Sequence, residues 1–471
     1  MSTGILRLQL EYFNRLGLIN KFCYICIKMA KFNTKLGVIA ATVGSAVGLG
    51  NIWRFPYEAG VHGGGAFLII NIIFVLILGI PVICAEFLIG RHSGADVCNA
   101  FGFFKRGRNW RFIGWMGLCA SILILGFYSV VAGWTVYYIQ QSIAGFEGVH
   151  NADDLHNMFV EFSSEGWMPL LWTVVFLAIN FFVLIRGVEK GIEKMSNILL
   201  PVLFIILIAF TVNSLLLPEA GHGLEFLFKP DFSQITPGVL LGALGQAFFS
   251  LSLGLGCLIT YASYFRPETP LVKTASISAL LDAMVAILAG MIIFPAVFTF
   301  GQEPAAGPQL VFEVLPSIFM NMPGGMFWSI LFFVLLFVAS LTSTISLFET
   351  AAAFLIGRGV ARFKAVCITM GVVVCLATLC SLSFGPLAGA TLFGLNFFDF
   401  SDFVSSNILL PLGGMCSSVF VGWIVERRVV NAELLGAAPS GGKRLIVKTI
   451  IFSLRYIAPA GIGLVFIFGL L

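Results

Sequence analysis

Long apolar stretches separated by short polar segments run through the chain from about residue 36 to its last residue. Each stretch is long enough for a helix that crosses a bilayer, which takes about 20 apolar residues. The alternating strands of roughly ten residues that a membrane barrel needs are absent from the sequence. The pattern therefore predicts an all-α integral membrane protein with eleven spans near 36–58, 66–89, 112–140, 168–185, 192–217, 237–261, 274–300, 326–356, 365–382, 403–425 and 449–471.

Composition leaves no room for a large soluble domain. Hydrophobic residues make up 59% of the 471 residues and charged residues only 11%, against roughly 25% charged residues in soluble proteins. Met29 directly precedes the first span, so either Met1 or Met29 can be the start, and in the second case residues 1–28 are an upstream extension. The expected organisation is a cytoplasmic segment 1–35, five-span repeats 36–217 and 237–425, and an eleventh helix 449–471.

Lysines and arginines lie on one side of the predicted spans. Nearly all of them occupy the N-terminal segment and the linkers 91–111, 186–194, 266–273, 358–364 and 427–448. The exceptions are Lys229 in an opposite loop, Arg54 inside the first span and Arg455 inside the last. By the positive-inside rule, the N-terminus is cytoplasmic and the C-terminus lies outside a bacterial inner (plasma) membrane. The net charge of +4 thus reflects segregated charge and implies no nucleic-acid partner. The oligomeric state is left open.

Glycines interrupt the first span. Gly44, Gly48 and Gly50 come directly before Asn51, and each interior glycine costs a helix about 1 kcal/mol relative to alanine. Close helix packing is one explanation, because Gly44 and Gly48 have GxxxG spacing. The other is an unwound turn, which a bilayer tolerates only where it lines a protein cavity.

A second interruption in the sixth span favours the unwound turn. Ser250, Ser252, Gly254 and Gly256 fall within seven residues there. Spans one and six are corresponding members of two five-span halves. Because five is odd, the second half starts on the opposite side of the membrane from the first, so the two halves have inverted topology. Two broken helices in corresponding positions of inverted repeats point to a secondary transporter with its site at the midplane.

Oxygen-bearing residues in the second half supply candidate cation ligands. Asp282 is a carboxylate inside the seventh span, which marks function unless it makes a buried structural hydrogen bond. The Ala339 carbonyl, Thr342 and Ser343 share one face of the eighth span; hydroxyls bonded to their own helix are the alternative. Broken helices present N–H groups to an anion and carbonyls to a cation, so a zwitterion with Na+ suits both.

Several motifs together resemble those of the neurotransmitter:sodium symporter family, which has the leucine-transporter fold. They are GSAVGLGNIWRFPY with the following GGGAF, FFSLSLG with ITYASY, ASLTS in the eighth span and RYIAPA in the last. The resemblance covers nearly the whole chain and implies a bacterial, eleven-span member of the family. It also implies two Na+ sites and an amino-acid substrate.

The resemblance assigns site residues by position. The first Na+ site would use the Ala46 carbonyl, Asn51, Ser250, Asp282 and the substrate carboxylate. The second would use the carbonyls of Gly44, Val47 and Ala339 with the hydroxyls of Thr342 and Ser343. The substrate would lie along Ala46, Gly48 and Gly50, with its carboxylate near Tyr128 and its side chain among Ile124, Phe249, Ser252, Leu255, Ser346 and Leu347.

This mostly apolar set suits a hydrophobic or aromatic amino acid. Gly48 stands where monoamine-transporting relatives have an aspartate, which argues against monoamines. Ala286 replaces the serine that coordinates chloride in some relatives, and the fixed charge of Asp282 predicts chloride independence.

The resemblance also implies gates. Arg54 and Asp402 occupy the positions of the extracellular gate pair, with Asp399 one turn earlier as an alternative acid, and Glu86 is expected to hold amides of the broken sixth helix. The intracellular pair of many relatives aligns with Met29, Phe32 and Gly357, so Lys28 or Lys31 would replace its cation.

The function implied is sodium-coupled symport of an amino acid into the cell by alternating access. No covalent chemistry, and hence no enzyme, is implied, and the five histidines have no metal-ligand spacing. Two alternatives stay open from the residues alone. One is a proton-coupled transporter of the same fold, because Asp282 can titrate, and the other is an amino-acid sensor that does not transport.

Overall fold

The structure, a computed structural model, describes residues 31–105, 108–301, 310–436 and 441–470. Within these ranges the regular structure is helical, apart from an isolated bridge between Leu392 and Leu395. The all-α expectation is therefore confirmed. The proposed extension 1–28, together with Lys28 and Met29, lies outside the described residues.

Helices lie at all eleven predicted spans. Eight described helices are long and apolar enough to cross a membrane, and ten if each pair bent at a short break is counted as one span. The sixth span falls short of that test because it is divided into two shorter helices. The eight spans that pass this test by themselves are α5–α6 (Gly65–Ser93), α8 (Arg111–Ile143), α11 (Lys194–Leu215), α15 (Leu271–Thr299), α17 (Gly325–Ile356), α18 (Arg362–Leu382), the segment Phe397–Ile424 that contains α19 and α20, and α22–α23 (Gly441–Leu470). Helix α10 (Met168–Leu184) passes it only together with the short helix before it, from which it is bent by 76°.

The first span breaks where the glycines predict. Helix α3 (Lys35–Ala46) is followed by Val47, whose ψ of 116° is extended, and the helix resumes as a π-helical turn (Gly50–Arg54) and α4 (Phe55–Val61). The two halves meet at 52°. The Gly48 and Leu49 N–H groups and the Val47 carbonyl thus leave the helical ladder and bond side chains instead.

The sixth span breaks in the same way, between α13 (Pro237–Ser250) and α14 (Cys257–Ser263). Ser252, Gly254 and Gly256 have φ angles of 53°, 83° and 77°. At Gly254 a side chain is also excluded by space, because a Cβ there would lie 2.3 Å from the Leu410 carbonyl oxygen. The glycines predicted to open this helix are therefore needed for its path.

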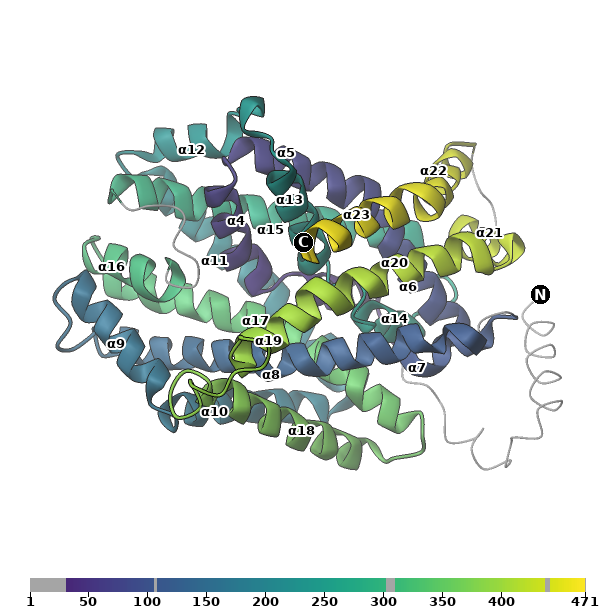
Figure 1. The fold of residues 1–471 in the computed structure, drawn as a ribbon, viewed down its shortest axis with the longest axis horizontal. Helices are drawn as coiled ribbons and strands as arrows, with labels where there is room; N and C mark the ends of the chain where they lie inside the picture. The colour runs from purple at the N-terminus through teal and green to yellow at the C-terminus, as the bar shows by residue number, and fades with distance from the viewer. Residues whose placement is uncertain (1–30, 106–107, 302–309, 437–440, 471) are drawn as a thin grey trace.

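The remaining spans form a bundle around the two breaks. Figure 1 shows α8 running almost the full length of the bundle, with α10 and α18 beside it. Short helices α9 (Ala152–Ser164), α12 (Ala220–Phe228) and α16 (Leu315–Met320) lie at one end of the bundle, and α21 (Arg427–Leu435) lies at the other. The bundle positions the breaks in α3–α4 and α13–α14 at its centre.

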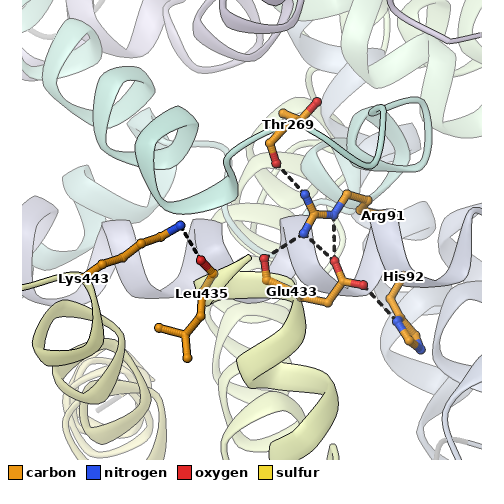
Figure 2. Close-up of polar contacts among 6 residues, drawn as sticks. All are labelled: Arg91, His92, Thr269, Glu433, Leu435 and Lys443. Carbon is orange, nitrogen blue, oxygen red and sulfur yellow. Dashed lines mark hydrogen bonds and ion pairs between the residues drawn. The ribbon is translucent and has the colours of Figure 1, made fainter. Parts of the chain in front are cut away.

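A polar cluster joins three linkers at the end that carries α21 (Figure 2). Arg91, at the end of α6, donates through Nε to Glu433 Oε2 at 2.7 Å and through Nη1 to the Thr269 carbonyl at 2.5 Å. His92 Nδ1 lies 3.1 Å from Glu433 Oε1. Burial raises the pKa of Glu433, but the His92 hydrogen bond and the Arg91 charge outweigh it and lower that pKa below its usual value. Linkers predicted to share one side of the membrane thus contact one another.

Candidate functional site

A small buried cavity lies between the two broken helices. Its volume is about 30 Å³, enough for about two or three water molecules. Nine of the ten residues proposed to bind substrate line it; Ser346 is the exception. The lining residues are Ser45, Ala46, Gly48, Gly50, Ile124, Tyr128, Phe249, Ser250, Ser252, Leu255, Ser343, Leu347 and Leu410.

One end of this cavity is polar. The Leu49 backbone N–H, released by the break, donates to the Tyr128 hydroxyl at 3.0 Å. A Cβ on Gly48 would lie 2.8 Å from the Tyr128 hydroxyl and 2.6 Å from Ser343 Oγ. The absence of a side chain at Gly48 therefore keeps this polar end open.

Asn51, Ser250 and Asp282 form one buried oxygen-rich cluster. The Asn51 amide Nδ2 donates to Asp282 Oδ1 at 2.7 Å and to Ser250 Oγ at 2.9 Å. Ser250 Oγ in turn donates to Asp282 Oδ2 at 2.6 Å. Three spans, the first, sixth and seventh, thus bring together the side chains that the sequence assigned to the first Na+ site.

A second cluster joins the first and eighth spans. Ser343 Oγ donates to the Val47 carbonyl at 3.0 Å, and Thr342 Oγ1 donates to the Ala339 carbonyl at 3.0 Å. A Cβ on Gly44 would lie 3.2 Å from Thr342 Cβ, so the glycine allows α3 to approach α17 this closely. All five residues assigned to the second Na+ site are therefore neighbours.

Ser346 lies behind the cavity wall and not on it. Ser45 Oγ donates to Ser346 Oγ at 2.9 Å, and Ser346 Oγ donates to the Ser343 carbonyl at 2.7 Å. Ser252 Oγ donates to the Ser45 carbonyl at 2.9 Å. Ser45 and Leu410 were missed by the sequence analysis. The position of Ser45 inside the glycine-rich break was a usable signal, whereas Leu410 is an ordinary leucine of an apolar span.

Two further buried polar side chains form hydrogen bonds with backbone groups at the breaks. The Gly254 backbone N–H donates to Glu86 Oε1 at 2.8 Å, which confirms that Glu86 holds an amide of the broken sixth helix. Gln246 Nε2 donates to the Gly50 carbonyl at 2.9 Å and ties the two breaks together. Both side chains are fully buried, so their hydrogen bonds hold the unwound backbone in place.

A larger cavity of about 270 Å³, called the vestibule below, lies above the small one. Phe249 and Tyr128 line both cavities and separate them. Arg54 and Asp402 both line the vestibule, while the carboxylate of Asp399 accepts a hydrogen bond from Asn396 Nδ2 at 2.7 Å. Of the two acids considered for the gate, Asp402 is therefore the one that faces the same space as Arg54.

The opposite end is closed by a different set of charges from the one expected. Glu349 in α17 is fully buried and accepts hydrogen bonds from Arg362 Nη2 at 2.6 Å and from the Tyr264 hydroxyl at 2.7 Å. Arg266 Nε donates to the Phe32 carbonyl at 3.0 Å. The sequence analysis missed Glu349, although it is an acid inside an apolar span, the same signal that singled out Asp282.

Comparison with known proteins agrees with this geometry. The model of the sodium:neurotransmitter symporter family matches residues 29–157 and 150–469. The chain belongs to this family. The symporter is 37% identical over 442 residues to the sodium-dependent transporter YhdH of Bacillus subtilis, covering 93% of this chain and 97% of the relative. It is 36% identical over 407 residues to a sodium-dependent transporter of Haemophilus influenzae, covering 84% and 89% of the two chains.

A solved structure has the same fold. The crystal structure of MhsT in complex with L-phenylalanine matches the symporter with a TM-score of 0.86 and 42% identity, covering 93% of this chain and 99% of that one. The leucine-transporter fold, with its inverted repeats and two broken helices, is thereby confirmed. The symporter is a sodium-dependent transporter and not an enzyme.

Proposed function

We propose that the symporter carries an amino acid with a hydrophobic or aromatic side chain into the cell together with Na+. The observation that carries this proposal is the two-ended cavity between the breaks. Backbone N–H groups and the Tyr128 hydroxyl suit a carboxylate at one end, and Ile124, Phe249 and Leu347 suit an apolar side chain at the other. The complex of the similar protein MhsT with L-phenylalanine supports the same substrate class.

The cavity has to enlarge when substrate binds. A volume of about 30 Å³ holds about two or three waters and not an amino acid with an apolar side chain. Phe249 separates the cavity from the vestibule and is only partly buried, so its rotation toward the vestibule makes room. Selection for the size of the substrate side chain therefore depends on how far Phe249 and its neighbours must move.

Two Na+ ions are proposed as co-substrates. The first would lie among Asn51, Ser250 and Asp282, and the substrate carboxylate would add a ligand. The Asn51 amide, whose Nδ2 faces Asp282 and whose oxygen accepts from the Gly48 N–H, would have to rotate to offer that oxygen to the ion. The second would lie among the Gly44, Val47 and Ala339 carbonyls, Thr342 and Ser343. Both are sets of hard oxygen donors, the kind that such cations require. Each inward charge gains about 2.3 kcal/mol per 100 mV of membrane potential.

Transport then proceeds by alternating access. Binding of two ions and one amino acid stabilises the state in which both ends are closed, and loss of the second Na+ lets the inner end open. The second ion is suited to this role because its ligands come from α3 and α17, which it would hold together. The cation-rich loops support an orientation in which the inner end and the N-terminus face the cytoplasm.

The direct test is uptake into proteoliposomes of purified symporter with an imposed sodium gradient. A panel of labelled amino acids that includes phenylalanine, leucine, alanine and glutamate is offered singly. We expect uptake of the apolar members, and no uptake when K+ replaces Na+. Equal uptake of glutamate, or uptake that persists without sodium, contradicts the proposal.

Tyr128→Phe is expected to weaken substrate binding about ten-fold. The change removes the hydroxyl that Tyr128 would offer to the substrate carboxylate, and a hydrogen bond to a charged group is worth about 1.5–3 kcal/mol. The half-saturating amino-acid concentration in sodium-driven uptake measures the effect. The matched change Tyr456→Phe, at a half-exposed ring in the last span, leaves that concentration unchanged.

Transport is expected to be independent of chloride. Asp282 supplies a permanent negative charge beside the first Na+ site, and Ala286, one turn later, offers no hydroxyl for an anion. Uptake at an unchanged rate after gluconate replaces all chloride is the expected result. A strict requirement for chloride overturns it.

A further inference from the structure

Arg54 has an acidic neighbour on its own helix. Arg54, Glu58 and His62 are spaced i, i+4 and i+8, so they follow one face of α4 and its flanking turns. Arg54 Nε lies 3.6 Å from Glu58 Oε1, and the two side chains are 28% and 16% exposed. Both line the vestibule. The arginine of the proposed outer gate therefore already has an ion-pair partner while the vestibule is open.

The other carboxylate oxygen of Glu58 is held by His62. His62 Nδ1 lies 3.3 Å from Glu58 Oε2 and 2.9 Å from the Glu58 carbonyl. Because a carbonyl only accepts, Nδ1 carries the hydrogen. The ring of His62 stacks on Phe67 with centroids 5.6 Å apart, and Gly242 leaves room for it, since a Cβ there would lie 2.9 Å from His62 Cε1. Glu58 is thus braced with one oxygen toward Arg54.

Asp402 faces Arg54 from the other side of the same vestibule. Its Oδ1 accepts a hydrogen bond from Ser406 Oγ at 2.7 Å, so the described structure gives it a local partner. The Arg54 guanidinium lies 4.6 Å above the ring of Phe249, directly over the cavity. One cation therefore stands between two acids, one on its own helix and one across the opening.

We propose that Glu58 is a positioning residue of the outer gate, which holds Arg54 away from Asp402 while the vestibule is open. The inference rests on the proposed alternating-access function and names a residue that influences closure of the vestibule. When the vestibule closes, Arg54 leaves Glu58 and pairs with Asp402. The difference in free energy between these two ion pairs therefore contributes to the equilibrium between the open and closed vestibule. Removing either acid shifts the equilibrium, and the two removals shift it in opposite directions.

The test measures the openness of the vestibule directly. Phe398 in α19 lines it and is only partly buried, so a Phe398→Cys variant reports openness by its rate of reaction with a membrane-impermeant thiol reagent. The exposed Cys119, Cys367 and Cys375 are replaced by serine in this background, so that only the new thiol is read. Glu58→Gln in this background is expected to lower the rate about two- to five-fold, the range typical of partly exposed ion pairs. Asp402→Asn is expected to raise it. With Arg54→Gln present, Glu58→Gln has no further effect, because the residue acts through Arg54.

A matched control separates this role from general effects of charge. Glu225 forms an i,i+4 pair with Lys229 in α12 and does not line the vestibule, so Glu225→Gln leaves the labelling rate unchanged. Glu58→Asp keeps the negative charge but moves it one methylene farther from Arg54. This variant is used if Glu58→Gln does not fold, and it is also expected to lower the labelling rate.

The outcomes distinguish this inference from the proposed function. A parent protein whose labelling ignores sodium overturns the transport cycle itself. A sodium-responsive parent whose labelling is unchanged or faster in Glu58→Gln overturns only the role of Glu58. An effect of Glu58→Gln that persists without Arg54 also overturns it.

Discussion

Asp282→Ala is expected to abolish sodium-dependent uptake, with a loss of roughly 100-fold or more. The Asp282 carboxylate accepts hydrogen bonds from both Asn51 and Ser250 within 2.7 Å, and bonds to a charged group are worth about 1.5–3 kcal/mol each. The change removes these bonds together with the only carboxylate of this cluster. The residual neutral groups then have no fixed charge to offset that of the ion. Initial uptake rates over a series of Na+ concentrations measure the loss.

Thr342→Ala at the second site is expected to have a smaller effect, about ten-fold, because a neutral hydroxyl is a weaker ligand. The control is Thr369→Ala in α18, where the hydroxyl likewise bonds its own helix, to the Ala365 carbonyl at 3.0 Å. It removes the same atoms from a buried position away from both clusters and leaves uptake unchanged. Sodium-dependent uptake that survives both Asp282→Ala and Thr342→Ala contradicts the site assignment.

Gly254→Ala is expected to lower uptake more than about ten-fold and to reduce thermal stability. The residue has a φ of 83°, which costs an L-residue about 1–3 kcal/mol, and the new Cβ would lie 2.3 Å from the Leu410 carbonyl oxygen. Relief of that contact pulls the Gly254 amide from Glu86. The cavity wall formed by Leu255 then shifts with it. Uptake and the melting temperature in detergent are both measured.

Gly245→Ala provides the matched control in the same span. Gly245 lies inside α13, and a Cβ there meets no atom within 4 Å. Alanine favours a helix over glycine by about 0.5–1 kcal/mol, so this variant keeps its uptake and is as stable as the parent or slightly more so. Equal losses in the two variants show that the sixth span tolerates no change at all, and they exclude a specific role for the Gly254 turn.

Most of the fold was predictable because membrane insertion depends on local composition. A stretch of about 20 apolar residues crosses the bilayer wherever it lies in the chain, and helices occupy every predicted span. Breaks were predictable for a related reason. Clustered glycines such as Gly48 and Gly254 disfavour a helix by backbone entropy alone, and the structure opens at both places.

Buried charge was the other reliable signal. Asp282 and Glu86 stand out in an apolar background because each costs several kcal/mol without partners, and both have them. Glu349 carried the same signal. Its partner Arg362 lies thirteen residues away in a neighbouring helix, and the choice of partner depends on how α17 and α18 pack.

By itself, the sequence determined the class of protein, the spans, the two breaks and the residues that bear oxygen at the midplane. Only the tertiary structure decided which of these residues face a common space. It placed Leu410 on the cavity wall and Ser346 behind it. It also paired Arg54 with Glu58 on its own helix while Asp402 faces the same opening. Hydropathy and glycine content act locally along the chain, whereas the partner of a charge depends on which helices pack together and on the conformation they hold.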